Sequence, residues 1–191
     1  MISTIGDSLK NCLLIATPQL DAGIFKSSVT YICEHNEEGA MGIIVNRPSN
    51  LMLSDIVEDV LDNADTGLDH RPVMVGGPVG TERGFVLHQT LGELSQWESS
   101  LQVTDELALT GSRDILRALS VGDGPEDYLV VLGYAGWDAG QLESELAENA
   151  WIISPAVPEI LFSTPFHKRA EAAAKLLGID LAALSIHGGR A

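Results

Sequence analysis

The segment YLVVLGY at residues 128–134 constrains the fold of this chain more than any other part of its sequence. Successive side chains of a strand point to opposite faces of the sheet, and this segment places apolar side chains on both. A strand that is apolar on both faces needs cover on each of them. Residues 128–134 therefore predict a central strand that is buried on both sides.

Two earlier segments predict a hairpin. Residues 28–35 alternate between two faces with a period of two, and residues 41–45 are apolar again. The polar segment 36–39, which ends in glycine, separates them. This pattern is typical of two antiparallel strands joined by a loop of about four residues.

Helix signals become frequent in the second half of the chain. Four segments carry residues that favour a helix N-terminus, followed by apolar side chains at helical spacing. They predict helices from Ser54 and over residues 112–119, 141–149 and 164–177. Hairpins first and strand–helix–strand units later are typical of a mixed α/β (α+β) fold. No internal repeat or linker divides the chain, so residues 1–191 are predicted to form a single compact domain, a twisted mixed β-sheet with helices packed on it.

The charge of the chain is strongly negative, with 27 acidic against 11 basic residues and a formal net charge of −16. Residues 53–70 and 118–167 carry acids and no lysine or arginine at all. This argues against a nucleic acid or an anionic membrane as an electrostatic partner. The acidic segments fit either a solvated surface or a docking face for a basic partner or a cation.

The two cysteines, Cys12 and Cys33, do not form a disulfide framework or a CxxC metal motif. They are expected to be buried thiols in a reduced, cytoplasmic protein. Only five apolar residues, 12–16, follow Lys10 near the start, too few for a signal peptide. No apolar run approaches the length of a membrane span, so no membrane association is expected.

Three side chains suggest a catalytic or metal-binding alternative. Cys33 and His35 are two residues apart on a predicted strand, so their side chains are expected on one face. With His88 at the end of another strand, they could form a Cys–His nucleophilic pair or a metal site. A buried cysteine and a hydrogen-bonded histidine explain the same residues, and two ligands without a third predict no metal site.

Two glycine-rich segments stand out. The first, VGGPVG at residues 75–80, lacks the lysine of a phosphate loop, and Pro78 removes a backbone N–H donor, so a structural turn is expected. The second runs from Gly133 to Trp137 and is followed by a predicted helix that begins near Gln141 and Glu143. Its position at the end of a central strand predicts either a structural corner or a ligand or partner site.

Several motifs taken together resemble the YqgE/AlgH family of bacterial proteins. They occur in register from about residue 13 to residue 189: LIATP at 14–18, SVTYICEHN at 28–36, GAMG at 39–42, NRP at 46–48, GGPV at 76–79, RGFVLH at 83–88, and GYAGW at 133–137 with GQLE at 140–143. The resemblance implies a cytosolic protein of mixed α/β fold. It also implies a role in transcriptional regulation, from which part of the family's name comes. No catalytic residues are established for the family, so the resemblance assigns none here.

These observations together favour a non-enzymatic binding or regulatory domain that acts through a protein or a small ligand, with no cofactor and no metal. The alternative is an enzyme of unknown class with a site at Cys33, His35 and His88 near the segment from Gly133 to Trp137. Direct DNA binding is the least favoured reading, because the chain has no basic stripe. The candidate ligand-binding residues are His35, Arg47, His88, Tyr134, Trp137, Gln141 and Glu143. Whether His35, Arg47, His88 and Trp137 line a common cavity is the question that a structure would answer first.

Overall fold

A computed structural model describes residues 8–61, 71–90 and 96–187 of the chain. Its strands are β1 (Cys12–Ala16), β2 (Val29–Asn36), β3 (Gly39–Ile44), β4 (Pro48–Met52), β5 (Pro72–Val75), β6 (Val79–Gln89), β7 (Ser100–Gln102), β8 (Leu107–Thr110), β9 (Tyr128–Asp138) and β10 (Trp151–Pro155). The α-helices are α1 (Leu53–Leu61), α2 (Arg113–Ser120), α3 (Gln141–Ala147), α4 (Arg169–Leu176) and α5 (Leu181–His187). A π-helical turn, η1 (Glu159–Ser163), and a 3-10 turn, η2 (Phe166–Lys168), precede α4.

The strands form one curled sheet in the order β10-β1-β2-β3-β9-β6-β8-β7. All pairs along this path are antiparallel, while β5 runs parallel to β9 and also pairs with β4. The early hairpin is confirmed as β2 and β3, and the sheet is mixed because of the β5–β9 pair. The mixed helix-and-strand fold predicted from the sequence is therefore confirmed.

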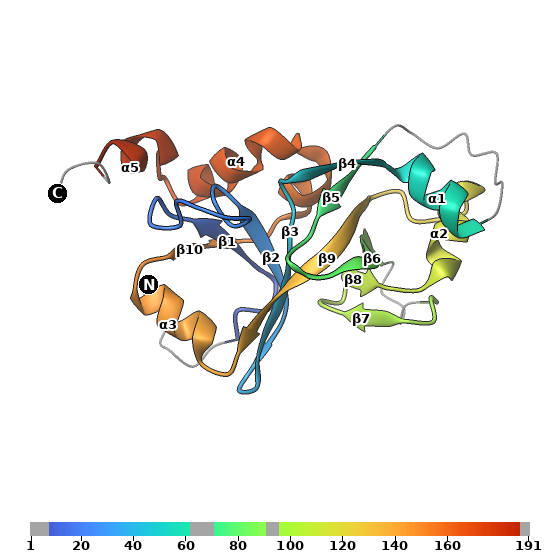
Figure 1. Cartoon of the computed structure of the whole chain (residues 1–191), viewed down its shortest axis with the longest axis horizontal. Coiled ribbons are helices and arrows are strands. Elements are labelled where there is room, and N and C mark those ends of the chain that lie inside the picture. Colours follow the sequence, from blue (N-terminus) through green and yellow to red (C-terminus); the bar gives the residue numbers. More distant parts are fainter. Residues whose placement is uncertain (1–7, 62–70, 91–95, 188–191) are drawn as a thin grey trace.

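β9 is the central strand of the sheet and crosses it diagonally (Figure 1). Its first half pairs with β5 and β6, and its second half pairs with β3. Leu129 and Val131 enter one apolar core, while Val130 enters another on the opposite face. The burial on both faces predicted for residues 128–134 is thus observed. Odd- and even-numbered side chains of the strand point to opposite faces, and each face is covered by its own layer.

Three apolar clusters hold the layers together. The largest lies inside the curl of the sheet and is closed by η1 and α4, through side chains such as Leu161 and Ala173. A second lies between the sheet and α3, around Trp137 and Leu142. A third lies under α1 and α2, which stand together at the right of Figure 1, around Val57 and others. The helices α1, α2, α3 and α4 are therefore each held by the burial of apolar side chains against the sheet.

Several helix boundaries differ from those predicted, since α2 covers Arg113–Ser120 rather than 112–119 and α3 ends at Ala147 rather than 149. The first helix begins at Leu53 rather than after Ser54, and Asp55 accepts a hydrogen bond from the backbone N–H of Met52 at 2.7 Å. The predicted helix over residues 164–177 is divided into the turn η2 and the helix α4. Pro165 has φ −53° and ψ 138°, an extended conformation that keeps the chain out of the helix at that point.

Candidate functional site

A β-bulge in β2 separates Cys33 from His35. Ile32 is paired with Gly42 and Glu34 with Met41, so one extra residue lies between the two pairs. A bulge of one residue reverses which face the following side chains occupy. Cys33 accordingly lies in the core inside the curl, with its thiol pKa raised by burial, whereas His35 contacts α3. The expectation that Cys33 and His35 share a face is therefore wrong.

His35 and Glu143 form a hydrogen-bonded pair at the outer end of β2. The backbone N–H of Leu9 donates to Nδ1 of His35 at 2.9 Å, so the ring proton is on Nε2. Nε2 lies 2.6 Å from Oε1 of Glu143 and donates to it. The pKa of Glu143 is held below its usual value, first by its own backbone N–H and then by His35. The two predicted residues are thus brought together.

Trp137 and Gln141 converge on a carboxylate that the sequence analysis did not single out. Oε2 of Glu145 accepts the indole N–H of Trp137 at 2.9 Å and that of Trp151 at 2.7 Å. Oε1 accepts the side-chain N–H of Gln141 at 3.0 Å. The two indole rings pack edge-to-face at 6.2 Å, and Phe25 packs against both. The four-residue spacing of Gln141 and Glu145 was the available signal.

His88 lies apart from both groups, in a buried polar chain. Its Nδ1 donates to the backbone carbonyl of Gln89 at 3.0 Å, so Nε2 accepts from Thr110 Oγ1 at 2.8 Å. Burial lowers the pKa of His88, and the hydrogen bond to Gln89 opposes that effect. His88 is paired with Tyr128, at the opposite end of β9 from Trp137 and about 30 Å from it along the strand. The predicted convergence of Cys33, His35 and His88 is wrong.

The segment from Gly133 to Trp137 is not a corner after a strand, because β9 continues through it to Asp138. Gly133 has φ +73°, and a Cβ on it would lie 2.6 Å from the carbonyl oxygen of Gly77. This irregularity places Tyr134 against Phe85, with ring centroids 6.1 Å apart, and Trp137 against the layer under α3. The two aromatic candidates therefore belong to different layers.

Arg47 lies at the β3–β4 junction. Its Nη2 donates to the backbone carbonyl of Lys26 at 2.7 Å, and its own carbonyl accepts the backbone N–H of Val75 at 2.7 Å. His35, Arg47, His88 and Trp137 line neither the cavity between α1 and α2 nor the smaller cavity between β1, α4 and α5. The structure thus does not bring these four residues together at either cavity, because the bulge in β2 and the diagonal course of β9 carry them to different layers.

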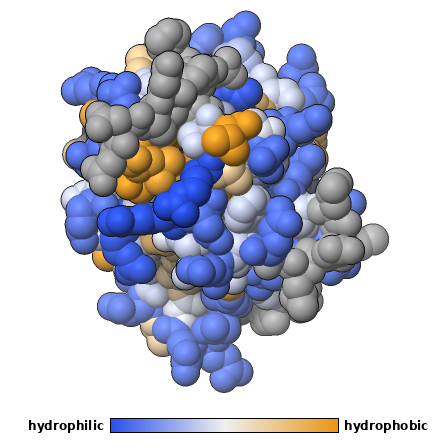
Figure 2. All heavy atoms as spheres, turned by 90° about the vertical axis from the view of Figure 1, so that its right-hand side faces the viewer, coloured by the Kyte–Doolittle hydropathy of each residue, from blue (hydrophilic) through white to orange (hydrophobic). Residues whose placement is uncertain are grey.

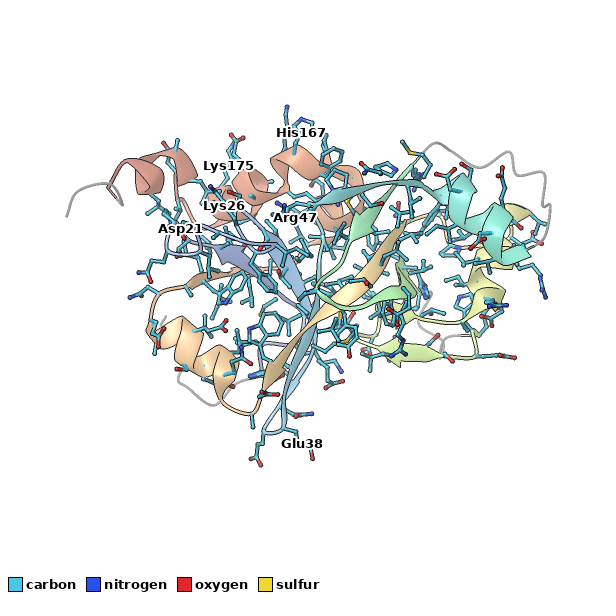
Figure 3. All side chains as sticks on the ribbon, viewed as in Figure 1. Asp21, Lys26, Glu38, Arg47, His167 and Lys175 are labelled. Atoms are coloured by element: carbon cyan, nitrogen blue, oxygen red, sulfur yellow. The ribbon has the colours of Figure 1, made fainter. Side chains whose placement is uncertain are left out.

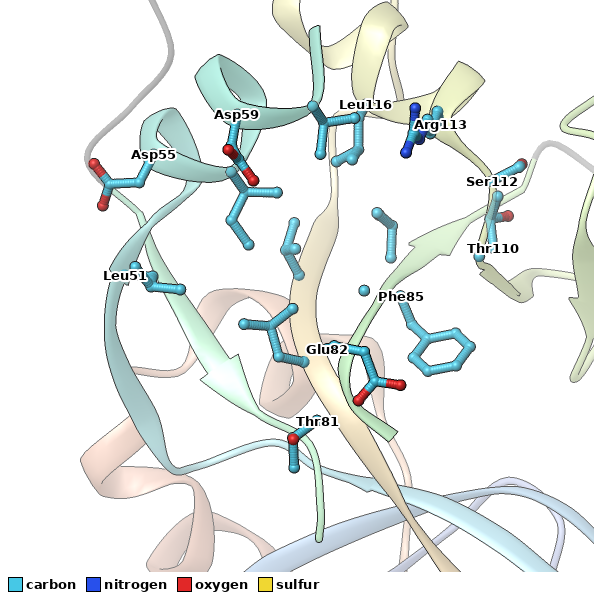
Figure 4. A pocket seen from close by; sticks show the side chains of 17 residues that line it. Leu51, Asp55, Asp59, Thr81, Glu82, Phe85, Thr110, Ser112, Arg113 and Leu116 are labelled. Atoms are coloured by element: carbon cyan, nitrogen blue, oxygen red, sulfur yellow. The ribbon is translucent and has the colours of Figure 1, made fainter. Parts of the chain in front are cut away.

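The larger cavity, of about 600 Å³, lies instead between α1, α2 and the strands β6 and β9. Figure 4 shows its side chains converging from these elements. Its apolar lining consists of Leu51, Ile56, Val60, Phe85, Val86, Leu116, Val130 and Leu132. Asp55, Asp59, Glu82, Thr81, Thr110, Ser112 and Arg113 add polar groups. None of these residues was a candidate from the sequence, since the cavity arises where helices from two distant segments meet the sheet.

The described part of the chain has no group of three or more His, Cys, Asp or Glu side chains that could hold a metal ion. In the same residues no helix is both long and apolar enough to cross a membrane.

Comparison with families of known proteins gives one match that covers most of the chain. Residues 13–182 match the family model described as AlgH-like. A UPF0301 protein of Nitrosococcus oceani is 49% identical over 183 residues, which cover 95% of this chain and 96% of that protein. A UPF0301 protein of Thioalkalivibrio sulfidiphilus is 49% identical over 188 residues, covering 98% and 100%.

Two solved structures resemble the fold. The solution structure of the AlgH protein from Pseudomonas aeruginosa has a TM-score of 0.77 and 45% sequence identity, and the match covers 100% of both chains. A crystal structure of a protein from Corynebacterium diphtheriae has a TM-score of 0.72 at 17% identity, covering 95% of this chain and 99% of the other. At that identity the second likeness supports the fold alone.

Proposed function

Because this chain belongs to the AlgH-like family, whose relatives' names state no activity, we propose from its geometry that it is a ligand-binding regulatory domain of the cytoplasm. The ligand is a small molecule with an apolar body, held in the cavity between α1 and α2. The single observation that supports this proposal most is the cavity of about 600 Å³ with its apolar floor. Cavities of this size, apolar with a few polar groups, are typical of small-molecule sites.

The floor of the cavity is built on a packed core, which favours a preformed site. Val86 and Val130 line the cavity and also belong to the apolar cluster under α1 and α2. Four charged side chains line the cavity: Asp55, which accepts the backbone N–H of Met52, and Asp59 on α1, Glu82 on β6 and Arg113 on α2 (Figure 4). Among the described residues, the last three have no such local partner. The two carboxylates and the guanidinium would orient a polar group on the ligand, while the floor takes its apolar body.

The surroundings of the nucleophilic and basic side chains favour binding over catalysis. Cys33 is fully buried, and burial raises the pKa of its thiol, so the reactive thiolate is disfavoured. His88 is also buried and uses both ring nitrogens in hydrogen bonds within the protein. An accessible nucleophile next to an available base is what the enzyme alternative would require.

The regulatory part of the proposal rests on protein contact rather than on DNA. Helix α1, which forms one wall of the cavity, exposes the acids Asp55, Glu58 and Asp59. Figure 2 shows the face on which α1 and α2 lie, and hydrophilic residues cover most of it. A basic protein surface would complement these acids, and a ligand in the cavity would touch the same helix. Retention of the chain on duplex DNA at low salt would contradict this part of the proposal.

Gly84 allows a direct test of the cavity. It lines the cavity, its φ is not in the left-handed region, and a Cβ built on it meets only Leu132 Cδ2, at 3.8 Å. A larger side chain can therefore enter the cavity without a clash with the backbone. Gly84→Phe fills part of the space, whereas Gly84→Ala is the matched control.

The probe is N-phenyl-1-naphthylamine, a neutral apolar fluorophore, titrated into the full chain. We expect saturable binding to the parent chain and to Gly84→Ala, and at least about tenfold weaker binding to Gly84→Phe. Backbone amide shifts of Gly111 and Leu116, both at the cavity, should move in the first two proteins. Equal binding to all three proteins, or no saturable binding to any, would overturn the proposal.

A further inference from the structure

Basic side chains gather on one side of this acidic chain. Five of the 11 lysine and arginine residues come from three segments that meet there: Lys26, Arg47, Lys168, Arg169 and Lys175. Figure 3 shows Lys26, Arg47, Lys175 and His167 along the same upper side of the molecule, with the acid Asp21 among them. In a chain of net charge −16, these side chains are the positive charges that would attract an anion to this side.

Arg169 supplies a buried positive charge at this side. It is 5% exposed, its Nε donates to the backbone carbonyl of Thr164 at 3.0 Å, and its Nη1 donates to that of Val45. Burial lowers its pKa to about 10, so the guanidinium is charged at neutral pH. Its hydrogen-bond acceptors are neutral carbonyls, and no carboxylate among the described residues pairs with it. A buried charge of this kind is stabilised by a nearby opposite charge.

Arg47 lies two residues beyond the carbonyl that Arg169 contacts. Its backbone is fixed by the hydrogen bond from Val75, and its Nη2 is held by the carbonyl of Lys26. Its Nε is buried and has no hydrogen-bond partner within the described part of the chain. A guanidinium has five N–H donors in a planar fork that matches the oxygens of phosphate and carboxylate groups. Arg47 therefore has an N–H donor that no described residue accepts, and a small shift of the guanidinium would offer it to an anion while the backbone of Arg47 stays held.

A small cavity of about 260 Å³ lies between β1, α4, α5 and residues 17–27. Arg47 and Arg169 do not line it, but Arg47 is hydrogen-bonded to the backbone of Lys26 and Arg169 precedes Ala170, and both of these neighbours do line it. Lys26 lines it, together with the polar side chains of Thr17 and Ser27. The rest of its lining is mostly apolar, from Ile15, Ala16, Pro18, Leu20, Ala170, Leu181 and Leu184, with Asp21 as its one acid. Its volume is slightly below the range of about 300–1,000 Å³ usual for ligand sites, which fits part of a small metabolite rather than a dinucleotide.

We propose that Arg47 and Lys26, with the charge of Arg169 behind them, bind the oxyanion group of a small molecule whose short apolar part enters this cavity. The oxyanion is a phosphate or a carboxylate, since both offer the paired oxygens that a guanidinium binds. This site shares no lining residue with the cavity between α1 and α2, so its test is independent of the proposed function.

The test is an NMR titration of the full chain with inorganic phosphate and, separately, with acetate. The side-chain Nε–Hε resonance of Arg47 reports on the guanidinium directly. Arg47→Gln removes the central donor, and Lys26→Gln removes a charge while keeping the backbone carbonyl that anchors Arg47. Arg117→Gln is the matched control, because Arg117 is exposed on α2 and lines neither cavity.

We expect saturable phosphate or acetate binding that moves the Arg47 resonance, with the stronger anion identifying the class of ligand. Binding should weaken about tenfold or more in Arg47→Gln and in Lys26→Gln, and stay unchanged in Arg117→Gln. Lys26→Gln keeps the test decisive if Arg47→Gln fails to fold. Equal weakening in Arg117→Gln would show diffuse counter-ion attraction and overturn the proposal. An Arg47 resonance that does not shift would also overturn the proposal. Binding of duplex DNA in preference to either small anion would overturn it as well.

Discussion

His35 Nε2 lies 2.6 Å from Glu143 Oε1, and this contact joins the outer end of β2 to the first turn of α3. The same ring accepts the backbone N–H of Leu9 on Nδ1, and the backbone carbonyl of His35 accepts the hydroxyl of Ser8. One side chain thus holds three segments that are far apart in the sequence. In the described structure, His35 therefore connects β2 with the segment before β1 and with helix α3.

Glu143→Gln should lower stability at neutral pH and leave it nearly unchanged in acid. The pKa of Glu143 is depressed in the folded protein, so the ionised carboxylate stabilises the fold above the unfolded pKa of about 4.3. That contribution is lost as the pH falls through the folded pKa. Because the Glu143 side chain is 42% exposed, we expect a loss of only about 0.5 kcal/mol at pH 7. Urea unfolding at pH 7 and at a series of lower pH values down to about pH 2 measures both values. The same difference at neutral pH and at the lowest pH would contradict this account.

Glu145→Ala should cost about 3 kcal/mol, far more than an ordinary change on a helix surface. The carboxylate accepts the indole N–H groups of Trp137 and Trp151, whose rings are 6% and 5% exposed. Without it, two N–H donors on buried rings lose their acceptor. Glu145→Gln keeps one oxygen and should recover part of the loss. The measurement is urea unfolding followed by tryptophan fluorescence.

The control for this prediction is Glu148→Ala, one residue beyond α3, where the side chain is exposed. It should change the free energy of unfolding by no more than about 0.5 kcal/mol. If Glu145→Ala and Glu148→Ala are equally mild, the shared carboxylate does not stabilise the two tryptophans.

The fold could be predicted from the sequence where local pattern decides it. The alternation in residues 28–35 and the doubly apolar run in 128–134 depend on neighbouring residues alone, and both led to the observed strands. The bulge at Cys33 is different, because an extra residue in β2 is defined only by the pairing with β3. The prediction that Cys33 and His35 share a face assumed regular alternation through Cys33, and it was therefore wrong.

The candidate site was harder to predict than the fold. The structure brings His35 into contact with Glu143, and it joins Trp137 to Gln141 through Glu145, near the segment that the sequence singled out. The cavity between α1 and α2 forms only when two helices from distant parts of the chain pack across β6 and β9. No residue of that cavity carries a local signal of its role, which is why none was singled out.

His88 should make the protein less stable below about pH 6.5. Burial lowers the pKa of His88 in the folded protein, so the unfolded chain binds a proton more readily, and stability is lost as the pH falls from about 6.5 toward the folded pKa. His88→Gln should therefore reduce the decline in melting temperature between about pH 7.5 and pH 5.5. His167→Gln, at an exposed position, should leave that decline unchanged. An unaltered pH profile in His88→Gln would assign the acid sensitivity elsewhere.

Gly77→Ala should prevent stable folding, whereas Gly136→Ala should be tolerated. A Cβ on Gly77 would lie 2.1 Å from the backbone carbonyl carbon of Tyr134, so the chain that leads into β6 would have to move away from β9. A Cβ on Gly136 meets only Tyr134 Cε2, at 3.8 Å, which is ordinary contact, and its φ is not in the left-handed region. We expect a loss of about 3 kcal/mol or more in the first variant and less than about 1 kcal/mol in the second. Circular-dichroism melting of both proteins measures the difference. Equal melting temperatures would mean that β9 and the preceding turn do not approach as closely as described.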